Sequence, residues 1–282
     1  MKRTSIALAV LCGTTMFSAE SIKFNTKPGH DRLESGKSIS YLRIMPEKLK
    51  ENKFYRVSMQ IKLEQTDIMV CRTYRGETGG GAGWGRTTIT GPEWQKYCQY
   101  IAPGNVWTYY SIGVKTRGNS FLVKDIKIEE LDEQDLTSNL LLPLKGMGWH
   151  NAWSNYEAKI GFEKSEDSPF GAEVLAAEIN EGTGYPAILA IPVIPGRTLL
   201  LDMWVKGEPD EVWMATVSNS GSTIYPVKNE WSRQELKIKI KAKEPTVAKI
   251  VFWKPKNRKQ LKCSFAKLEA RYEKQDHSAE LQ

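Results

Sequence analysis

The chain is poor in the residues that most catalytic and metal sites require. It has four cysteines and three histidines in 282 residues, and His30, His150 and His277 show none of the spacings that bind zinc. There is no Gly-x-Ser-x-Gly nucleophile motif, and the acids between Glu129 and Asp135 are better explained by a solvated linker than by a catalytic carboxyl pair. We therefore expect no catalytic activity, with a glycoside hydrolase or polysaccharide lyase assembled from distant strands as the alternative.

Long apolar runs are also missing. The longest, Ile6 to Phe17, is too short to span a bilayer. It follows Lys2 and Arg3 and precedes the small residues Ser18 and Ala19, which is the usual build of a secretory signal peptide. We expect residues 1–19 to be removed and the mature chain to be secreted, periplasmic or on the cell surface. A lipoprotein at Cys12 is the minor alternative.

Acidic residues are missing from one stretch of the mature chain. Removal of Lys2 and Arg3 lowers the net charge from +7 to 7 − 2 = +5. The stretch from Lys237 to Lys262 holds ten Lys or Arg and a single acid, Glu244. These lysines either cover the solvent side of strands or attract an acidic polymer such as a uronate-containing or sulfated glycan. Nucleic acid is not an expected partner of an exported chain.

The mature chain keeps three cysteines, Cys71, Cys98 and Cys263. An odd number argues against a disulfide framework. Export makes a Cys71–Cys98 bond chemically permissible, and we expect Cys263 to be a buried free thiol.

Amphipathic helical periodicity is absent, and strand periodicity replaces it. In the segment LLLDMWVK, Leu199, Leu201, Met203 and Val205 alternate with a second set that contains Trp204, and such alternation marks a strand with one buried face. Turn signals recur about every ten residues. Short strands at regular spacing predict an all-β jelly-roll sandwich.

The second half of the chain repeats the pattern of the first. FYRVSMQIK corresponds to TLLLDMWVK, EWQKYCQYI to EWSRQELKI, and FLVKDIKIEEL to LKCSFAKLEAR, at offsets of 144, 137 and 140. A period of this length fits a whole domain copied in tandem. We expect a first sandwich over 20–132, a linker over 133–138, a second sandwich over 139–273 and a polar tail over 274–282.

The second repeat resembles the jelly-roll carbohydrate-binding modules related to families four, nine and twenty-two. The resemblance lies in the runs NLLLPLKGMGWHNAW, GFEKSEDSPFGAEVLAAEI and YPAILAIPVIPGRTLLLDMWVKG, and extends more weakly over 33–131. It implies sugar binding without catalysis. Some of these modules hold a structural calcium. Phe265 replaces the acid that would bind it in the second repeat, so the resemblance implies such a site only near Asp125, and no other cofactor.

Sugar binding by stacking requires exposed aromatic rings, and the chain has nine Trp and eleven Tyr. Strand alternation places Trp204 and Trp253 on polar sheet faces, where they could form one platform. Trp94 and Trp231, at equivalent positions of the two repeats, are expected to be structural. The predicted carbohydrate-binding residues are Trp204, Trp253, Trp149, Trp153, Trp84, Trp107 and Tyr109.

The predicted function is that of a secreted, non-catalytic protein that binds a polysaccharide or glycan through aromatic platforms. The alternative from another class is a surface structural or adhesive protein that contacts other proteins. Neither a particular sugar nor an oligomeric state is predicted.

Overall fold

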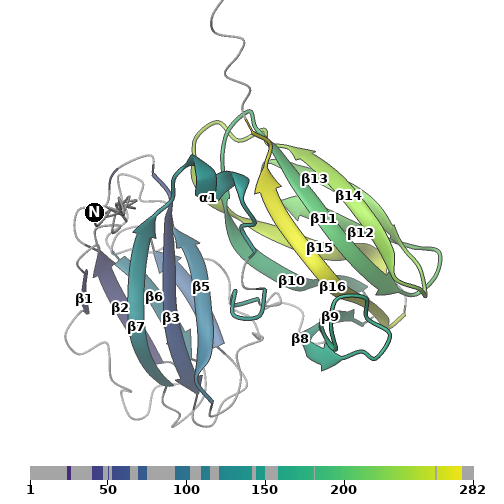
Figure 1. Cartoon of the computed structure of the whole chain (residues 1–282), viewed down its shortest axis with the longest axis horizontal. Coiled ribbons are helices and arrows are strands. Elements are labelled where there is room, and N and C mark those ends of the chain that lie inside the picture. The colour runs from purple at the N-terminus through teal and green to yellow at the C-terminus, as the bar shows by residue number, and fades with distance from the viewer. Residues whose placement is uncertain are drawn as a thin grey trace, which may run out of the picture.

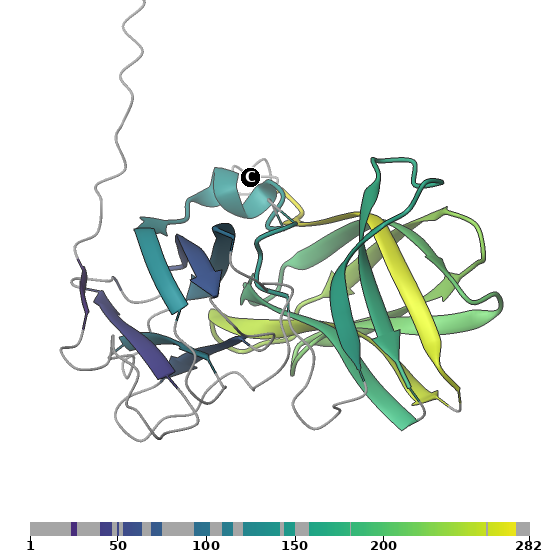
Figure 2. The ribbon, with the colours of Figure 1, turned by 90° about the horizontal axis from the view of Figure 1, so that it is seen from below.

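The computed structural model describes residues 24–26, 40–46, 50, 53–63, 69–74, 93–101, 109–114, 121–141, 144–149, 158–180, 182–257 and 259–274. These residues are nearly all in β-strands and form two sandwiches that lie side by side, with the short helix α1 at their junction (Figures 1 and 2). No helix in this part of the chain has the length and apolar character needed to cross a membrane.

The second sandwich consists of nine strands. They are β8 (Lys159–Lys164), β9 (Glu173–Ile179), β10 (Gly182–Val193), β11 (Thr198–Gly207), β12 (Glu211–Val217), β13 (Gly221–Val227), β14 (Ser232–Lys239), β15 (Thr246–Asn257) and β16 (Leu261–Tyr272). One sheet has the order β14-β11-β16-β9-β8 and the other β10-β15-β12-β13. Strands β9 to β16 alternate between the two sheets as in a jelly roll, except that β12 and β13 form a hairpin within one sheet. This arrangement confirms the predicted fold class.

The first sandwich repeats this order in a shorter form. Its strands are β1 (Phe24–Thr26), β2 (Ser40–Pro46), β3 (Tyr55–Leu63), β4 (Met69–Tyr74), β5 (Gln95–Ile101), β6 (Tyr109–Val114) and β7 (Phe121–Glu130). The order β5-β3-β7 matches β14-β11-β16, and β2-β6-β4 matches β10-β15-β12. Within the described ranges, no strand flanks β7 as β9 flanks β16.

A β-bulge also recurs in both sandwiches. It interrupts the pairing of β3 with β7 between Ser58 and Gln60, and that of β11 with β16 between Trp204 and Val205. A bulge inserts one extra residue and bends its strand. In the first sandwich this strand carries Asp125, whose φ is 54°. The same irregularity at corresponding strand pairs supports duplication of a whole domain.

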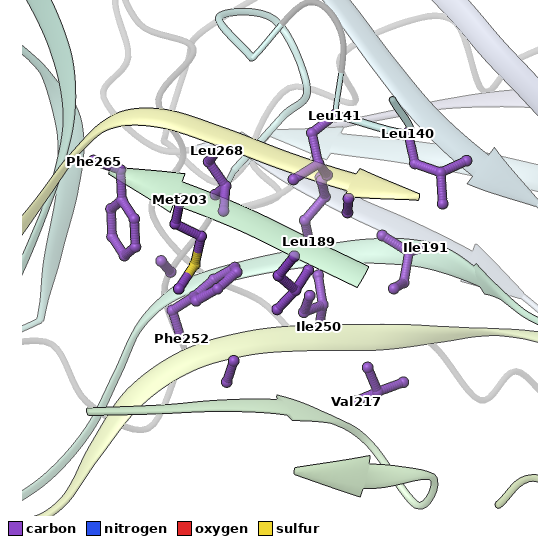
Figure 3. Packing of buried hydrophobic residues seen from close by; sticks show 14 of the residues in the cluster. Leu140, Leu141, Leu189, Ile191, Met203, Val217, Ile250, Phe252, Phe265 and Leu268 are labelled. Atoms are coloured by element: carbon purple, nitrogen blue, oxygen red, sulfur yellow. The ribbon is translucent and has the colours of Figure 1, made fainter. Parts of the chain in front are cut away.

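The core of the second sandwich follows from strand alternation. Along β11, Leu199, Leu201, Met203 and Val205 are buried while the residues between them are partly exposed. Figure 3 shows Met203, Phe265 and Leu268 facing Leu189, Ile250 and Phe252 of the opposite sheet. Burying such side chains contributes roughly 1.5 to 3 kcal/mol each.

The acidic segment between the sandwiches is ordered, although the sequence indicated a solvated linker. Helix α1 (Glu133–Thr137) begins with a capping box in which Asp132 accepts from the backbone N–H of Asp135 and Asp135 accepts from that of Asp132. Its Leu136 is buried, and Glu133 lies 2.9 Å from a guanidinium nitrogen of Arg197 in the second sandwich. These contacts anchor the helix.

The start of the second sandwich runs along the edge of the first. The N–H of Cys98 in β5 donates to the carbonyl of Gly146 at 2.7 Å, and the Tyr100 hydroxyl donates to the carbonyl of Leu140 at 2.7 Å. Residues 97–101 of β5 are all buried, so this strand is covered on both faces. Its contacts with β10 and β15 complete the junction.

Cys98 is a buried free thiol, and so is Cys263, as predicted. Burial raises the pKa of Cys98 to about 12. Because Cys98 is a free thiol, the bond to Cys71 is absent. The physical reason is that Cys98 lies opposite Ser58 on the outer face of its sheet, whereas Cys71 belongs to β4 in the other sheet.

Candidate functional site

Trp204 lies on the outer face of the five-stranded sheet. It alternates with the buried Met203 and Val205, which confirms the face predicted from the sequence. Its partners on the two neighbouring strands are Arg233 of β14 and Lys267 of β16. Trp204 is therefore flanked by a cation on each side.

Phe170 adds a second ring to this face. It belongs to the turn between β8 and β9, is half exposed, and meets Trp204 edge to face with ring centroids 5.5 Å apart. The Nζ of Lys267 lies 5.8 Å from the centre of the Phe170 ring. We refer to Trp204 and Phe170 together as the aromatic pair.

The turn that carries Phe170 is tied to the sheet by Asp167. The carboxylate of Asp167 accepts from the Nζ of Lys206 at 2.5 Å and from the hydroxyl of Ser165 at 2.7 Å. These bonds, that of Lys206 first, lower the pKa of Asp167 to about 2. The turn is thus held by a carboxylate that stays ionised in weak acid.

Asp202 organises the cations beside the aromatic pair. Its two oxygens accept from Nε and Nη2 of Arg233 at 3.0 and 3.1 Å, and Lys267 lies 3.4 Å away. Hydrogen bonding from Arg233 is the main cause that lowers the pKa of Asp202. Arg233 and Lys267 also pair with Glu235 and Glu269. The charges around the two rings are therefore balanced.

This arrangement suits recognition of a ring that has both apolar and polar edges. Exposed aromatic faces pack against the C–H groups of a sugar, and carboxylate and guanidinium groups hydrogen-bond its hydroxyls. Because the polar side chains already hold one another in place, they lose little conformational entropy when a ligand binds.

Trp253 lies on the other sheet, so it does not form one platform with Trp204 as the sequence suggested. It belongs to β15, and the outer faces of two packed sheets point away from each other. Tyr185 stacks on Trp253 with ring centroids 5.1 Å apart, and the indole N–H donates to the Thr216 hydroxyl at 2.9 Å. Alternation predicted the face within the strand but carried no information on which sheet the strand joins.

Trp149 is a core residue, which corrects its prediction as a binding residue. It is completely buried, and its ring centroid lies 6.0 Å from that of Phe252. A ligand has no access to it. Trp153, Trp84 and Trp107 lie outside the described residues, and Tyr109 begins β6 without a described side chain.

The prediction that Trp94 is structural is wrong. Trp94 is 37% exposed, and the Nζ of Lys124 lies 4.3 Å from the centre of its ring. Trp231, its expected equivalent, is partly buried. Sequence reasoning also missed Phe170 and Tyr185. The one signal for Phe170 is an aromatic residue between Pro169 and Gly171 in an otherwise polar turn.

The described residues contain no group of three His, Cys, Asp or Glu side chains that could hold a metal ion. Asp125, the position to which the sequence resemblance assigned calcium, is exposed and accepts from the side-chain amide of Gln60 at 2.8 Å.

Neither a family model nor a curated protein matches the sequence. Among solved structures, the chain is similar to the N-terminal CBM22-1–CBM22-2 tandem domain of Xyn10C from Paenibacillus barcinonensis, with 11% identity and a TM-score of 0.32 over 90% of this chain and 95% of that one. It is also similar to a variant of Bacillus subtilis oxalate decarboxylase OxdC, with 10% identity and a TM-score of 0.13 over 80% of this chain and 71% of that one. At these scores neither likeness decides a function.

Proposed function

We propose that the chain is an exported carbohydrate-binding protein and that its second sandwich binds a glycan at the aromatic pair. The observation that carries the proposal is the contact of the partly buried Trp204 with the half-exposed Phe170, on a sheet face whose flanking charges are already paired. The sequence resemblance to carbohydrate-binding modules points to the same ligand class.

The chemistry of this face supports binding rather than glycoside hydrolysis. A general acid that protonates a leaving oxygen needs a raised pKa. Asp202, the carboxylate next to Trp204, has a lowered pKa because Arg233 and Lys267 stabilise its charged form. It is suited to accept hydrogen bonds from sugar hydroxyls.

The test is affinity electrophoresis in gels that contain xylan, mannan or mixed-linkage β-glucan. For any polysaccharide that retards the wild type, Trp204→Ala and Phe170→Ala should each weaken binding about tenfold, because stacking one sugar on a large ring contributes roughly 1 to 2 kcal/mol. Unchanged retardation in both variants would place the sugar elsewhere.

Ile224→Ala is the matched control. Ile224 is 62% exposed and lies on β13 in the opposite sheet, so its truncation removes exposed apolar surface far from the aromatic pair. It should leave retardation unchanged. Phe170→Ala and Ile224→Ala should keep the wild-type melting temperature within a few degrees, since loss of an exposed side chain costs roughly 0.5 kcal/mol or less. Trp204→Ala removes a partly buried ring and should lower the melting temperature more, so its binding is compared at a temperature where it is fully folded.

A further inference from the structure

The outer face of the β5-β3-β7 sheet in the first sandwich carries an excess of positive charge. Gln60 of β3 lies opposite Lys96 of β5 and Lys124 of β7, and Ser58 lies opposite Lys127. Strand alternation puts Lys62 on the same face. We call Lys62, Lys96, Lys124 and Lys127 the basic face.

No acidic side chain in the described ranges forms a salt bridge with these four lysines. The corresponding face of the second sandwich differs, because there Lys206, Arg233 and Lys267 are all paired with acids. Asp125 follows Lys124 on β7, and one of its oxygens accepts from the side-chain amide of Gln60. The two copies of the domain have therefore diverged in charge on equivalent surfaces.

Like charges on one face of a sheet repel each other. Lys96 and Lys124 are separated by one strand, which places their backbones about 10 Å apart, close to the screening length of physiological salt. Such a cluster costs folding stability unless an anion neutralises it. An anionic ligand bound to this face would relieve the repulsion.

Trp94 lies at the edge of the basic face, just before β5. Its ring is 37% exposed and lies beneath the ammonium group of Lys124. Trp94, the side-chain amide of Gln60 and the four lysines thus place an aromatic surface, a hydrogen-bonding group and several cations close together. An exposed ring packs on sugar C–H groups, and the cations match repeated anionic groups.

We propose that the basic face binds an acidic polysaccharide, a sugar polymer that bears carboxylate or sulfate groups. This site is separate from the aromatic pair and takes a different class of glycan. Single-stranded nucleic acid fits less well, because its binding sites stack successive bases on several aromatic rings. Among the described residues of this sheet, Trp94 is the one exposed aromatic side chain.

The experiment measures binding of the intact chain to immobilised polygalacturonate, which carries carboxylates, and dextran sulfate, which carries sulfates, with uncharged dextran as the blank. Binding to at least one acidic polymer should weaken about tenfold between roughly 20 and 200 mM NaCl. Lys96→Gln combined with Lys124→Gln should weaken it about tenfold at low salt. Trp204→Ala should leave binding to the acidic polymer unchanged. The proposal for the basic face can therefore hold even if the aromatic pair binds no glycan.

Lys239→Gln combined with Lys241→Gln is the matched control. It removes the same charge from exposed positions of the Lys-rich stretch in the second sandwich, and it should weaken binding less than about twofold. The proposal is overturned if the control loses as much affinity as the test variant, if both acidic polymers bind no better than dextran, or if poly(A) RNA binds more tightly than either. Melting temperatures of both variants should equal or exceed that of the wild type, because each removes repulsion between lysines.

Discussion

At the scale of single residues, Asp202 is the side chain on which the order of the candidate site depends. Its side chain is 13% exposed, and it holds both cations that flank Trp204. Without it, Arg233 and Lys267 would keep only their pairs with Glu235 and Glu269, and no carboxylate would bridge the two cations. A carboxylate that is central to two ion pairs stabilises the fold and at the same time fixes the polar groups available to a ligand.

Asp202→Asn tests this role through the pH dependence of stability. Folding lowers the pKa of Asp202, so its contribution is present above the unfolded-state pKa and is lost as pH falls through the folded-state pKa. The variant should lose about 1 kcal/mol at neutral pH, a small value because the pairs lie near solvent. The difference in melting temperature from the wild type should shrink as pH falls below the unfolded-state pKa of Asp202 and disappear once pH lies below its folded-state pKa. A difference that stays constant as pH falls would mean that the loss is steric.

Single residues also show what the sequence could and could not predict about the site. The face of Trp204 followed from alternation with Met203, because neighbours along a strand determine it. The burial of Trp149 and the exposure of Trp94 could not be predicted in this way. Both depend on whether a segment distant in the chain covers the side chain. Phe170 completes the aromatic pair only through the turn that Lys206 and Asp167 hold in place.

At the scale of elements, helix α1 shows how a short acidic segment is stabilised as a helix between the two sandwiches. A five-residue helix is too short to be stable alone. It persists because Asp132 caps its first turn, Leu136 is buried, and Arg197 binds Glu133. The Ala substitution of a capping Asp costs about 1 kcal/mol.

Asp132→Ala should therefore lower the free energy of unfolding by about 1 kcal/mol, as measured by urea denaturation. Gln134→Ala is the control, because Gln134 lies exposed on the same helix and its side chain has no part in the capping box. Equal stability of the two variants would show that the capping box contributes nothing and that the packing of Leu136 alone maintains the helix.

The strands also show which part of the topology a sequence pattern cannot predict. Period-two alternation located β11, β14 and β15 and their buried faces. It could not place β11 and β15 in different sheets, because pairing is decided by hydrogen bonds between segments far apart in the chain. Order and spacing of the repeats nevertheless predicted the tandem sandwiches, since a duplicated domain keeps its strand order.

At the scale of the whole molecule, the two sandwiches behave as one packed body at their junction. Gly146 explains why the contact is so close. Its φ is 114°, and a Cβ at this position would lie 2.7 Å from the backbone oxygen of Lys96 in β5. Backbone cannot move aside as a flexible side chain can. We therefore expect both sandwiches of the wild type to unfold in a single calorimetric transition.

Gly146→Ala should separate the segment 144–149 from β5 and uncouple the sandwiches. Gly171→Ala is the matched control, because Gly171 also has a φ of 114° but has no atom within 4 Å of the added Cβ. Both variants incur the backbone strain of about 1 to 2 kcal/mol, and only Gly146→Ala adds the clash at the junction. Scanning calorimetry should show one transition for the control and, for Gly146→Ala, a broadened or split one at lower temperature. Identical thermograms for the two variants would mean that the sandwiches do not depend on this contact for their joint stability.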